Sequence, residues 1–399
     1  MSVANETAFV DYNSDLIRKG WVKEGLVQNA HKSFWAAYTG NSGESVVYQK
    51  NMTNVKEGNN IIFDYDGYLT GEMALDREQA WGKGEGKRKF SSSLKIRRGR
   101  IPVNNGDKFN GKEIGDLSIT EHSDSRRKLA DLWSRHKDQG HFDSVQGRLD
   151  SLDNSHVFRP NDRATIGDLV STDVMSYDFL LELNEKMLEG DGFAKGGKRM
   201  PLKPFQLQNG EVVWNLLLDN TAFFQLKKDT RFQDLVAQGD VRGMNNFLFK
   251  GQPIQIGQLM ITVAPVFFGT STDRRVGKTK PEISGFRKLD EDGLYTGEVG
   301  FGASTKKIAA RSVLLGAGAM QYGMGMEPDY NLEFSPDHKI TSESLLEVWF
   351  NIQKTQLLPE TVDYEEARIG NMDFGVIAVD TYATVGVCLL YTSPSPRDS

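Results

Sequence analysis

The sequence NNIIFDYDGYL (residues 59–69) and the sequence LKIRRGRIPV (residues 94–103) decide how the rest of this chain is organised. Apolar residues alternate with polar ones along both runs, which predicts two β-strands. Between the runs lies the glycine- and charge-rich stretch GKGEGKRK (residues 82–89), which is typical of a solvated loop. We therefore expect two long strands joined at a polar tip.

A long helix is predicted directly after these strands. The sequence SITE (residues 118–121) has the Ser-x-x-Glu spacing of a capping box. Leu129, Leu132, Trp133 and His136 then follow at helical spacing. These signals predict one long helix.

The predicted hairpin has no core of its own to cover. Two strands alone are only marginally stable in water, so such an arm needs a surface to lie on. The interpretation drawn from the sequence is that a neighbouring copy of the same protein provides that surface.

Composition narrows the functional classes. The chain has 399 residues, of which 38% are hydrophobic and 26% charged, which suits a globular protein of two or three compact units or of one elaborated domain. The formal net charge of −6 argues against a protein that grips nucleic acid electrostatically. A protein that encloses nucleic acid without adhering to it remains compatible with this charge.

The chain ends and the cysteine content give further expectations. No secretory signal is expected at the N-terminus, and the longest apolar runs are too short to span a bilayer. Cys388 is the only cysteine, so neither an intrachain disulfide nor a thiolate metal cluster is expected. Residues 388–399 look like a translated sequencing adapter, so the natural sequence is expected to be visible to Val387.

The remaining segments predict an α+β fold without regular alternation of strands and helices. Helices are expected at residues 21–38, 174–188, 232–241 and 308–322. Strands are expected at residues 212–218, 251–269, 345–350 and 374–379.

No catalytic, cofactor-binding or metal-binding constellation is predicted. The sequence GFAKGGK (residues 192–198) has phosphate-loop spacing, but Arg199 stands where Ser or Thr would hold magnesium, and a helix precedes it. His136 and His141 lack a third ligand at metal-like spacing and are interpreted as polar residues of the helix surface. No pair of carboxylates can be placed across a cleft from sequence alone, so a glycosidase has no positive support.

A row of cations follows the second predicted strand: Lys95, Arg97, Arg98 and Arg100. Such a row could bind nucleic acid. In an acidic protein, inter-subunit ion pairs or simple solvation are the better interpretation.

The order of these segments resembles the major capsid proteins of N-four-type tailed phages. The resemblance runs from the hairpin to Val387. The segments that carry it are GNNIIF (residues 58–63) leading to LTG (69–71), LADLW (129–133), DSVQG (143–147), RGMNNFLFKG (242–251), RSVLLGA (311–317) and DFGVI (373–377). Each segment alone is a weak signal, whereas their common order and spacing is specific.

The resemblance implies the Hong Kong-phage (HK-ninety-seven-like) major capsid fold, which has an N-terminal arm, an extended β-hairpin arm, a spine helix, and peripheral and axial domains. The expected division is an N-terminal arm at residues 1–50, the extended arm at 51–117, a peripheral domain at 118–250, an axial domain at 251–344, and a return to the peripheral domain at 345–387. The resemblance places the spine helix of the peripheral domain at residues 120–145.

The implied function is structural rather than enzymatic, namely an icosahedral shell around double-stranded DNA. The implied partners are copies of the chain itself in hexamers and pentamers. Scaffold, portal and decoration proteins are further candidates. The DNA would be enclosed without sequence-specific binding, no membrane is involved, and the expected location is the virion, assembled in the host bacterial cytoplasm.

Candidate inter-subunit contacts are basic residues of the hairpin and aromatic residues of the N-terminal arm: Lys87, Arg88, Lys95, Arg97, Arg98, Arg100, Trp21 and Trp35. Two alternatives stay open. One is the shell of a cellular nanocompartment of the same fold. The other is a β-rich carbohydrate-active hydrolase, which requires a cleft with two facing carboxylates.

Overall fold

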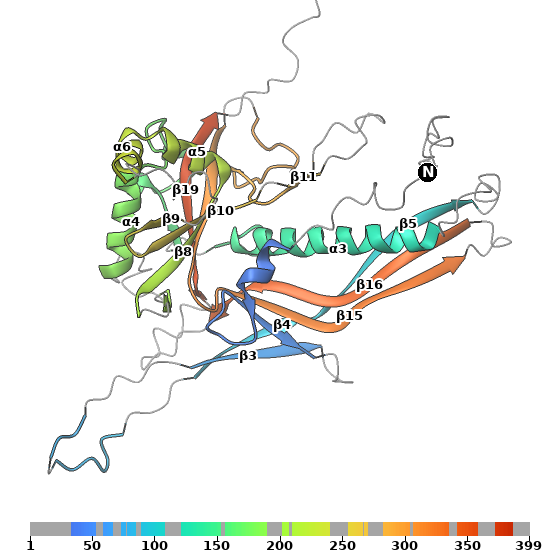
Figure 1. Ribbon diagram of the computed structural model, residues 1–399, viewed down its shortest axis with the longest axis horizontal. Helices are drawn as coiled ribbons and strands as arrows, with labels where there is room; N and C mark the ends of the chain where they lie inside the picture. Colours follow the sequence, from blue (N-terminus) through green and yellow to red (C-terminus); the bar gives the residue numbers. More distant parts are fainter. Residues whose placement is uncertain are drawn as a thin grey trace, which may run out of the picture.

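The computed structural model shows an elongated part and a compact part (Figure 1). The residues that the structure describes are 33–52, 59–66, 73–76, 78–84, 89–107, 121–152, 156–189, 202–206, 210–239, 254–265, 267–269, 282–303, 306–334, 341–357 and 372–385.

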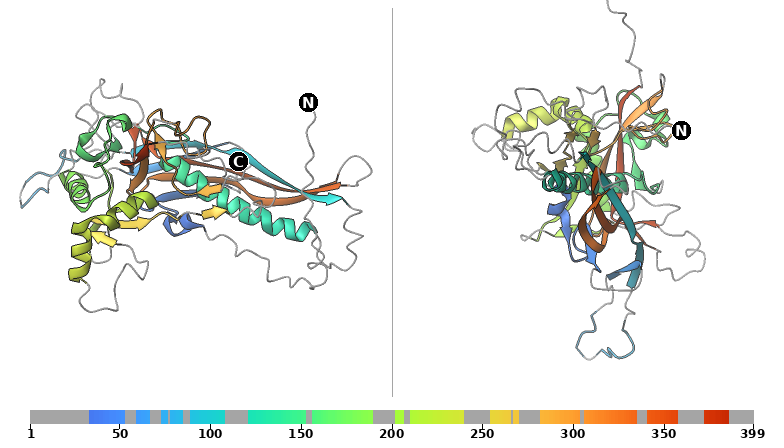
Figure 2. Two further views of the ribbon diagram at one scale, coloured as in Figure 1. Left: turned by 90° about the horizontal axis from the view of Figure 1, so that it is seen from above. Right: turned by 90° about the vertical axis from the view of Figure 1, so that its right-hand side faces the viewer.

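The elongated part is built on a long sheet with one helix along it (Figures 1 and 2). Its described strands lie in the order β1 (Thr39–Gly40), β2 (Val47–Asn51), β15 (Met320–Phe334), β16 (Thr341–Lys354) and β5 (Arg97–Asp107). β1, β2 and β15 are parallel, whereas β15, β16 and β5 alternate in direction.

Helix α3 (Glu121–Val145) covers one face of this sheet, which confirms the predicted long helix. Leu129 and Trp133 pack on Leu346 and Val348 of β16. The ring of Trp133 meets the ring of Phe350 edge-on at 4.5 Å between centroids. The apolar spacing seen in the sequence is therefore the face that α3 presents to the sheet.

Strands β3 (Asn60–Asp66) and β4 (Lys89–Lys95) form an antiparallel pair on the opposite face of the sheet. A Cβ added at Gly323 of β15 would lie 2.8 Å from side-chain atoms of both Ile61 and Leu94, so only glycine permits this close approach. Phe63 is fully buried with them.

The hairpin prediction is therefore corrected in two respects. Its base lies on the sheet of its own chain and needs no neighbour, because the alternating apolar residues Ile61, Phe63 and Leu94 make one continuous face. Its second strand is divided into β4 and β5, which belong to different sheets. Alternation specifies that a segment is a strand, but it does not specify the pairing partner.

The compact part contains the second large sheet. Its described strands run in the order β6 (Val157–Phe158), β19 (Val376–Val385), β14 (Lys307–Leu315), β8 (Val212–Leu218), β10 (Leu259–Val263) and β9 (Ile254–Ile256). In addition, β13 (Leu289–Asp290) pairs with β14, and β7 (Phe205–Gln206) pairs with β8. The sequence predicted the strands at 212–218, 251–269 and 374–379.

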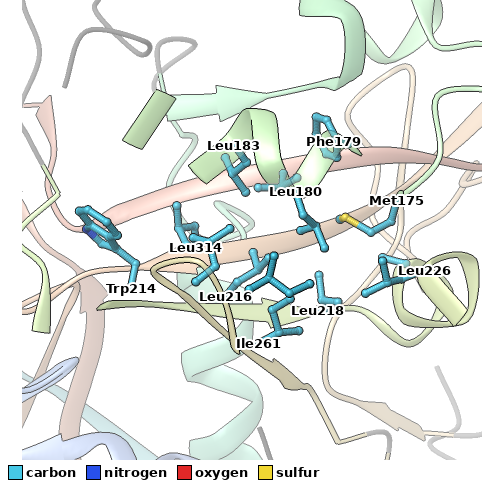
Figure 3. Close-up of a cluster of buried hydrophobic side chains, with 14 of the residues drawn as sticks. Met175, Phe179, Leu180, Leu183, Trp214, Leu216, Leu218, Leu226, Ile261 and Leu314 are labelled. Atoms are coloured by element: carbon cyan, nitrogen blue, oxygen red, sulfur yellow. The ribbon is translucent and has the colours of Figure 1, made fainter. Parts of the chain in front are cut away.

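Three helices pack against this sheet: α4 (Tyr177–Glu189), α5 (Asn220–Lys228) and α6 (Thr230–Gly239). Figure 3 shows Leu180 and Leu183 of α4 above Leu216 of β8, with Leu314 of β14 and Ile261 of β10 in the same cluster. Burying such aliphatic side chains contributes about 1.5–3 kcal/mol each, so this cluster stabilises the compact part.

The shorter described elements are η1 (Phe34–Tyr38), η3 (Pro160–Asp162), η4 (Ile166–Asp168), the pair β11 (Phe267–Gly269) and β12 (Glu282–Ser284), and the pair β17 (Gln356–Leu357) and β18 (Met372–Asp373). None of the described helices is long and apolar enough to cross a membrane.

The helix predicted at residues 308–322 is wrong. These residues form β14 and the start of β15, joined by a turn in which Gly318 has a φ of 71°. β14 lies between β19 and β8, and Ile308 to Leu315 are all buried. A strand buried on both faces shows a continuous apolar run without alternation, which periodicity alone does not distinguish from a buried helix.

Candidate assembly surfaces

The first described residues of the chain are fixed to α3. The Ser33 hydroxyl donates to Asp138 Oδ1 at 2.6 Å, and the Phe34 backbone N–H donates to Asp138 Oδ2 at 2.8 Å. Trp35 of η1 is completely buried, with its ring centroid 5.6 Å from that of His141 and 5.0 Å from that of Phe142. Trp35 is therefore a core residue of its own chain, and its place among the candidate inter-subunit contacts is corrected.

His141 is also buried, contrary to the surface position expected from the sequence. Its Nδ1 lies 2.8 Å from the Lys137 carbonyl oxygen, and its ring contacts Trp35 and Tyr322. Burial lowers the pKa of His141 to about 4, because a charged imidazole would lose its hydration there. The five-residue spacing from His136 gave no sign of this, since the covering residues come from η1 and β15.

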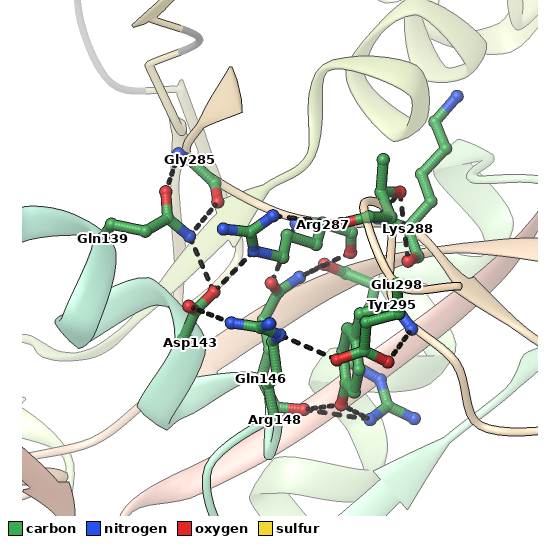
Figure 4. A network of polar contacts seen from close by, with 11 residues as sticks. Gln139, Asp143, Gln146, Arg148, Gly285, Arg287, Lys288, Tyr295 and Glu298 are labelled. Atoms are coloured by element: carbon green, nitrogen blue, oxygen red, sulfur yellow. Dashed lines mark hydrogen bonds and ion pairs between the residues drawn. The ribbon is translucent and has the colours of Figure 1, made fainter. Parts of the chain in front are cut away.

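The C-terminal end of α3 is held in a network of ion pairs and hydrogen bonds (Figure 4). Asp143 accepts from Arg148 Nη1 and from Arg287 Nε, both at 2.8 Å. Gln146 exchanges two hydrogen bonds with the backbone of Arg287, at 2.9 and 3.0 Å. These contacts join α3 to the loop that leads into β13.

A second charged cluster continues from this network into the sheet of the compact part. Arg311 of β14 forms a two-point ion pair with Asp380 of β19, at 2.7 and 2.9 Å, and donates to the Gln146 carbonyl at 3.0 Å. Arg159 approaches the same carboxylate at 3.2 Å. Each of these buried charges has a partner of opposite sign, as a structural role requires.

The arm tip, defined here as residues 73–76 and 78–84, carries large apolar side chains in solvent. The exposed fractions are 81% for Met73, 62% for Leu75 and 89% for Trp81. Its polar residues Glu78 and Lys83 pair with each other at 3.6 Å. Figure 1 shows this segment in light blue at the lower left, projecting away from the rest of the described chain.

Sequence reasoning missed these three apolar residues. It named Lys87 and Arg88, which lie outside the described residues, as does Trp21. The available signal was the presence of Met73, Leu75 and Trp81 within an otherwise polar excursion between two strands. Large apolar residues in such a loop have no local core, so they indicate a contact with something else.

The predicted row of cations is exposed: Lys95 ends β4, while Arg97, Arg98 and Arg100 lie on β5. Arg98 binds Glu347 of β16 at two points, one of them 2.5 Å from Nη2 to Oε2, and Arg100 Nε lies 3.8 Å from the same carboxylate. Trp349 Nε1 donates to Glu347 at 3.0 Å.

These contacts, the hydrogen bond from Arg98 above all, lower the pKa of Glu347 to about 2. Part of the row is therefore engaged within its own chain. Within the described parts of the chain, no group of three or more His, Cys, Asp or Glu side chains is arranged to hold a metal ion.

Comparison with known proteins identifies the fold. No protein-family model matches the chain, and no curated protein matches it. Among solved structures, the capsid of Ralstonia phage GP4 aligns with a TM-score of 0.66 at 19% identity, covering 98% of this chain and 99% of that one.

Two further structures align over most of their length. The capsid asymmetric unit of cyanophage Pam1 gives a TM-score of 0.59 at 12% identity, over 93% of this chain and 98% of that one. The acid-stable capsid of Helicobacter pylori bacteriophage KHP30 gives 0.58 at 14% identity, over 89% and 94%. The chain therefore has the α+β Hong Kong-phage capsid fold, as the sequence resemblance implied.

Proposed function

We propose that this chain is the major capsid protein of a tailed phage and forms an icosahedral shell around double-stranded DNA. The shared fold with phage capsids supports this proposal over nearly the whole chain. The observation that carries it is the arm tip, because Met73, Leu75 and Trp81 are exposed at a point remote from the core of their own chain.

Exposed apolar groups of this size favour a contact that buries them. Removing apolar surface from water contributes about 25 cal/mol per Å², and a large aromatic or aliphatic side chain contributes roughly 1.5–3 kcal/mol when fully buried. An arm that contacts a different surface on the next copy makes a head-to-tail interface, which forms a ring where the rotation between successive copies closes. Repeated over hexamers and pentamers, individually weak contacts give a stable shell.

The domain units are best drawn along the sheets. The sequence-based boundary at residue 250 separates β8 from β10, although both strands pair in one sheet. We assign the peripheral domain to the long sheet with α3, and the axial domain to the compact part with α4, α5 and α6. The extended arm then consists of β3, β4 and the arm tip.

The proposed partners are further copies of this chain, with scaffold, portal and decoration proteins in addition. The role is structural, with no reaction to catalyse. The net charge of −6 suits a wall that encloses DNA without binding its sequence. The proposed location is the virion, with assembly in the cytoplasm of the bacterial host.

The test is particle formation by the chain co-expressed with its neighbouring genes, measured by light scattering and negative-stain microscopy. Shells are expected for the unaltered chain. The triple replacement Met73→Ser, Leu75→Ser and Trp81→Ser is expected to abolish shells while the subunit keeps its melting temperature. The matched control is Glu78→Gln with Lys83→Gln, which alters the polar pair of the same tip and should still assemble.

A chain that stays monomeric with its neighbouring genes would overturn the proposal. Shells that form equally well with the triple replacement would refute the role assigned to the arm tip. Shells that hold an enzyme in place of DNA would assign the chain to the nanocompartment class.

A further inference from the structure

The two edges of the long sheet differ in how they are protected. The β5 edge carries Arg97, Arg98 and Arg100, all exposed, and also Pro102, which lacks a backbone N–H. Charged residues and proline are the usual means of preventing an edge strand from pairing with another chain. The β5 edge is therefore built to stay unpaired.

The opposite edge is incomplete. β1 pairs only with Val47 and Tyr48 and ends at Gly40, whereas β2 continues through residues 49–51. No described strand lies beside that continuation on the β1 side. β3 likewise has β4 as its single described partner. Two strand edges that have no partner among the described strands thus belong to the same region of the fold.

A groove of about 610 Å³ lies between these edges. Residues 48–52 of β2 and its end form one wall, residues 60–62 of β3 form the other, and Asn41 lies where β1 stops. Ile62 is 59% exposed, although it is a large aliphatic residue. Side-chain amides from Asn41, Asn51 and Asn60 add hydrogen-bonding groups to this apolar surface.

The backbone of β3 is directed toward this groove. Lys50 Nζ donates to the Ile62 carbonyl oxygen at 2.7 Å, so that carbonyl points away from β4. Main-chain groups alternate in direction along a strand, so those of Asn60 and Asp64 point the same way. β3 contains neither proline nor lysine, and Lys50 of β2 is the single lysine in the groove lining, so the groove can receive a strand.

We propose that the groove binds a β-strand formed by residues 7–12 (TAFVDY) of the same chain, which would continue the sheet where β1 ends. This segment alternates, with Ala8, Val10 and Tyr12 on one side and Thr7, Phe9 and Asp11 on the other. Asn5 precedes it and Asn13 with Ser14 follows it, and these residue types commonly bound strands. The carboxylate of Asp11 complements the ammonium of Lys50.

The length of the connecting chain supports binding within one molecule. Ser33 is anchored by Asp138, and the chain from Ser33 to Asn41 spans at most about 28 Å. The twenty residues from 13 to 32 have a root-mean-square end-to-end distance of about 25 Å as a flexible linker. A linker whose length matches the distance to be spanned gives an effective concentration of about millimolar, far above that of a second chain at micromolar concentration. The proposal does not depend on shell assembly.

Disulfide trapping in the unassembled full-length chain tests the proposal. With Cys388→Ser as background, Asn51→Cys is combined in turn with Ala8→Cys, Val10→Cys and Tyr12→Cys, because three positions cover the possible registers. The matched control pairs Val10→Cys with Glu185→Cys on the exposed side of α4. At least one groove pair is expected to form an intrachain disulfide about tenfold or more faster than the control.

Hydrogen exchange provides a second, independent measurement. Deleting residues 1–16 is expected to reduce protection of the Gln49 and Asn51 amides of β2, where the added strand would pair, about tenfold or more and to leave the Arg98 and Arg100 amides unchanged. Disulfide-linked dimers in place of intrachain products would overturn the proposal and make a second copy the occupant. Trapping no faster than the control, together with unchanged exchange, would show that residues 7–12 do not occupy the groove.

Discussion

Replacing Lys354 with methionine is expected to destabilise the subunit strongly. Lys354, the last residue of β16, and Asp373 of β18 have no solvent-exposed side-chain surface and form an ion pair at 2.6 Å. Lys354 Nζ also donates to the Ser151 carbonyl at 2.5 Å. The pair joins the long sheet to the segment that enters β19 and to the chain that follows α3.

The expected magnitude follows from burial of both charges. Lys354→Met leaves the Asp373 carboxylate without its counter-charge in a site closed to water. Breaking one side of a buried pair costs about 3–5 kcal/mol. The free energy of unfolding of a chain of this size falls by about 6 kcal/mol for each molar of guanidinium chloride, so the denaturant concentration at the unfolding midpoint should fall by about 0.5–0.8 M.

A double replacement separates the cost of an unpaired charge from the value of the pair. Lys354→Met with Asp373→Asn removes both charges, and the amide can still accept the hydrogen bond that Gln356 Nε2 donates at 3.1 Å. The double variant is expected to lose no more than about 1–2 kcal/mol, so the coupling free energy should exceed about 2 kcal/mol.

The assay is equilibrium unfolding of the unassembled subunit in guanidinium chloride, followed by tryptophan fluorescence. A loss below about 1 kcal/mol for the single replacement, or additive losses in the double variant, would refute the reasoning from burial. Far-ultraviolet circular dichroism serves as the control that all variants are folded before denaturant is added.

Three further predictions concern pH and backbone geometry. The pKa of His141 is near 4 in the folded chain and 6.5 in the unfolded chain, so the unfolded state binds more protons between these pH values. The free energy of unfolding should therefore fall by about 3 kcal/mol as the pH drops from 6.5 to 4, and His141→Gln should make this pH dependence weaker when unfolding is measured across an acid titration. Arg98→Ala should return the pKa of Glu347 from about 2 toward 4.5, measured by carbon-13 NMR of the carboxylate; an unchanged value would contradict the assigned cause. Gly375→Ala should cost about 2–5 kcal/mol in thermal unfolding, because φ is 76° and a Cβ would lie 2.8 Å from the Ala319 backbone. Gly82→Ala, with φ of 86° and open space, should cost only the backbone strain of about 1–2 kcal/mol.

Local sequence patterns were sufficient to predict the helices and strands that have one buried face. The spacing of Leu129 and Trp133 identified α3, and the alternation of Ile61 and Phe63 identified β3, whereas the predicted capping box falls on residues 118–120, outside the described residues. A helix or strand with one apolar face shows its period in the sequence because the other face must stay polar. The same reasoning failed for β14, where both faces are buried and the period disappears.

For the candidate residues, likewise, the sequence predicted some environments and not others. Exposure of Lys95, Arg97, Arg98 and Arg100 could be expected from charge alone. Burial of Trp35 and His141 could not, because each is covered by residues distant in sequence, such as Phe142 and Tyr322. An aromatic residue or a neutral histidine is compatible with either environment, so its neighbours decide.

The sequence by itself determined the fold class, the long helix and the order of segments shared with phage capsids, because periodicity, capping and turn chemistry act over a few residues. The tertiary structure alone decided which strands pair, since pairing joins segments as distant as β5 and β16, whose alternation fits many partners. It also decided that the hairpin base covers its own sheet while Met73, Leu75 and Trp81 remain exposed. Burial depends on what folds back over a residue, and that is a property of the whole chain.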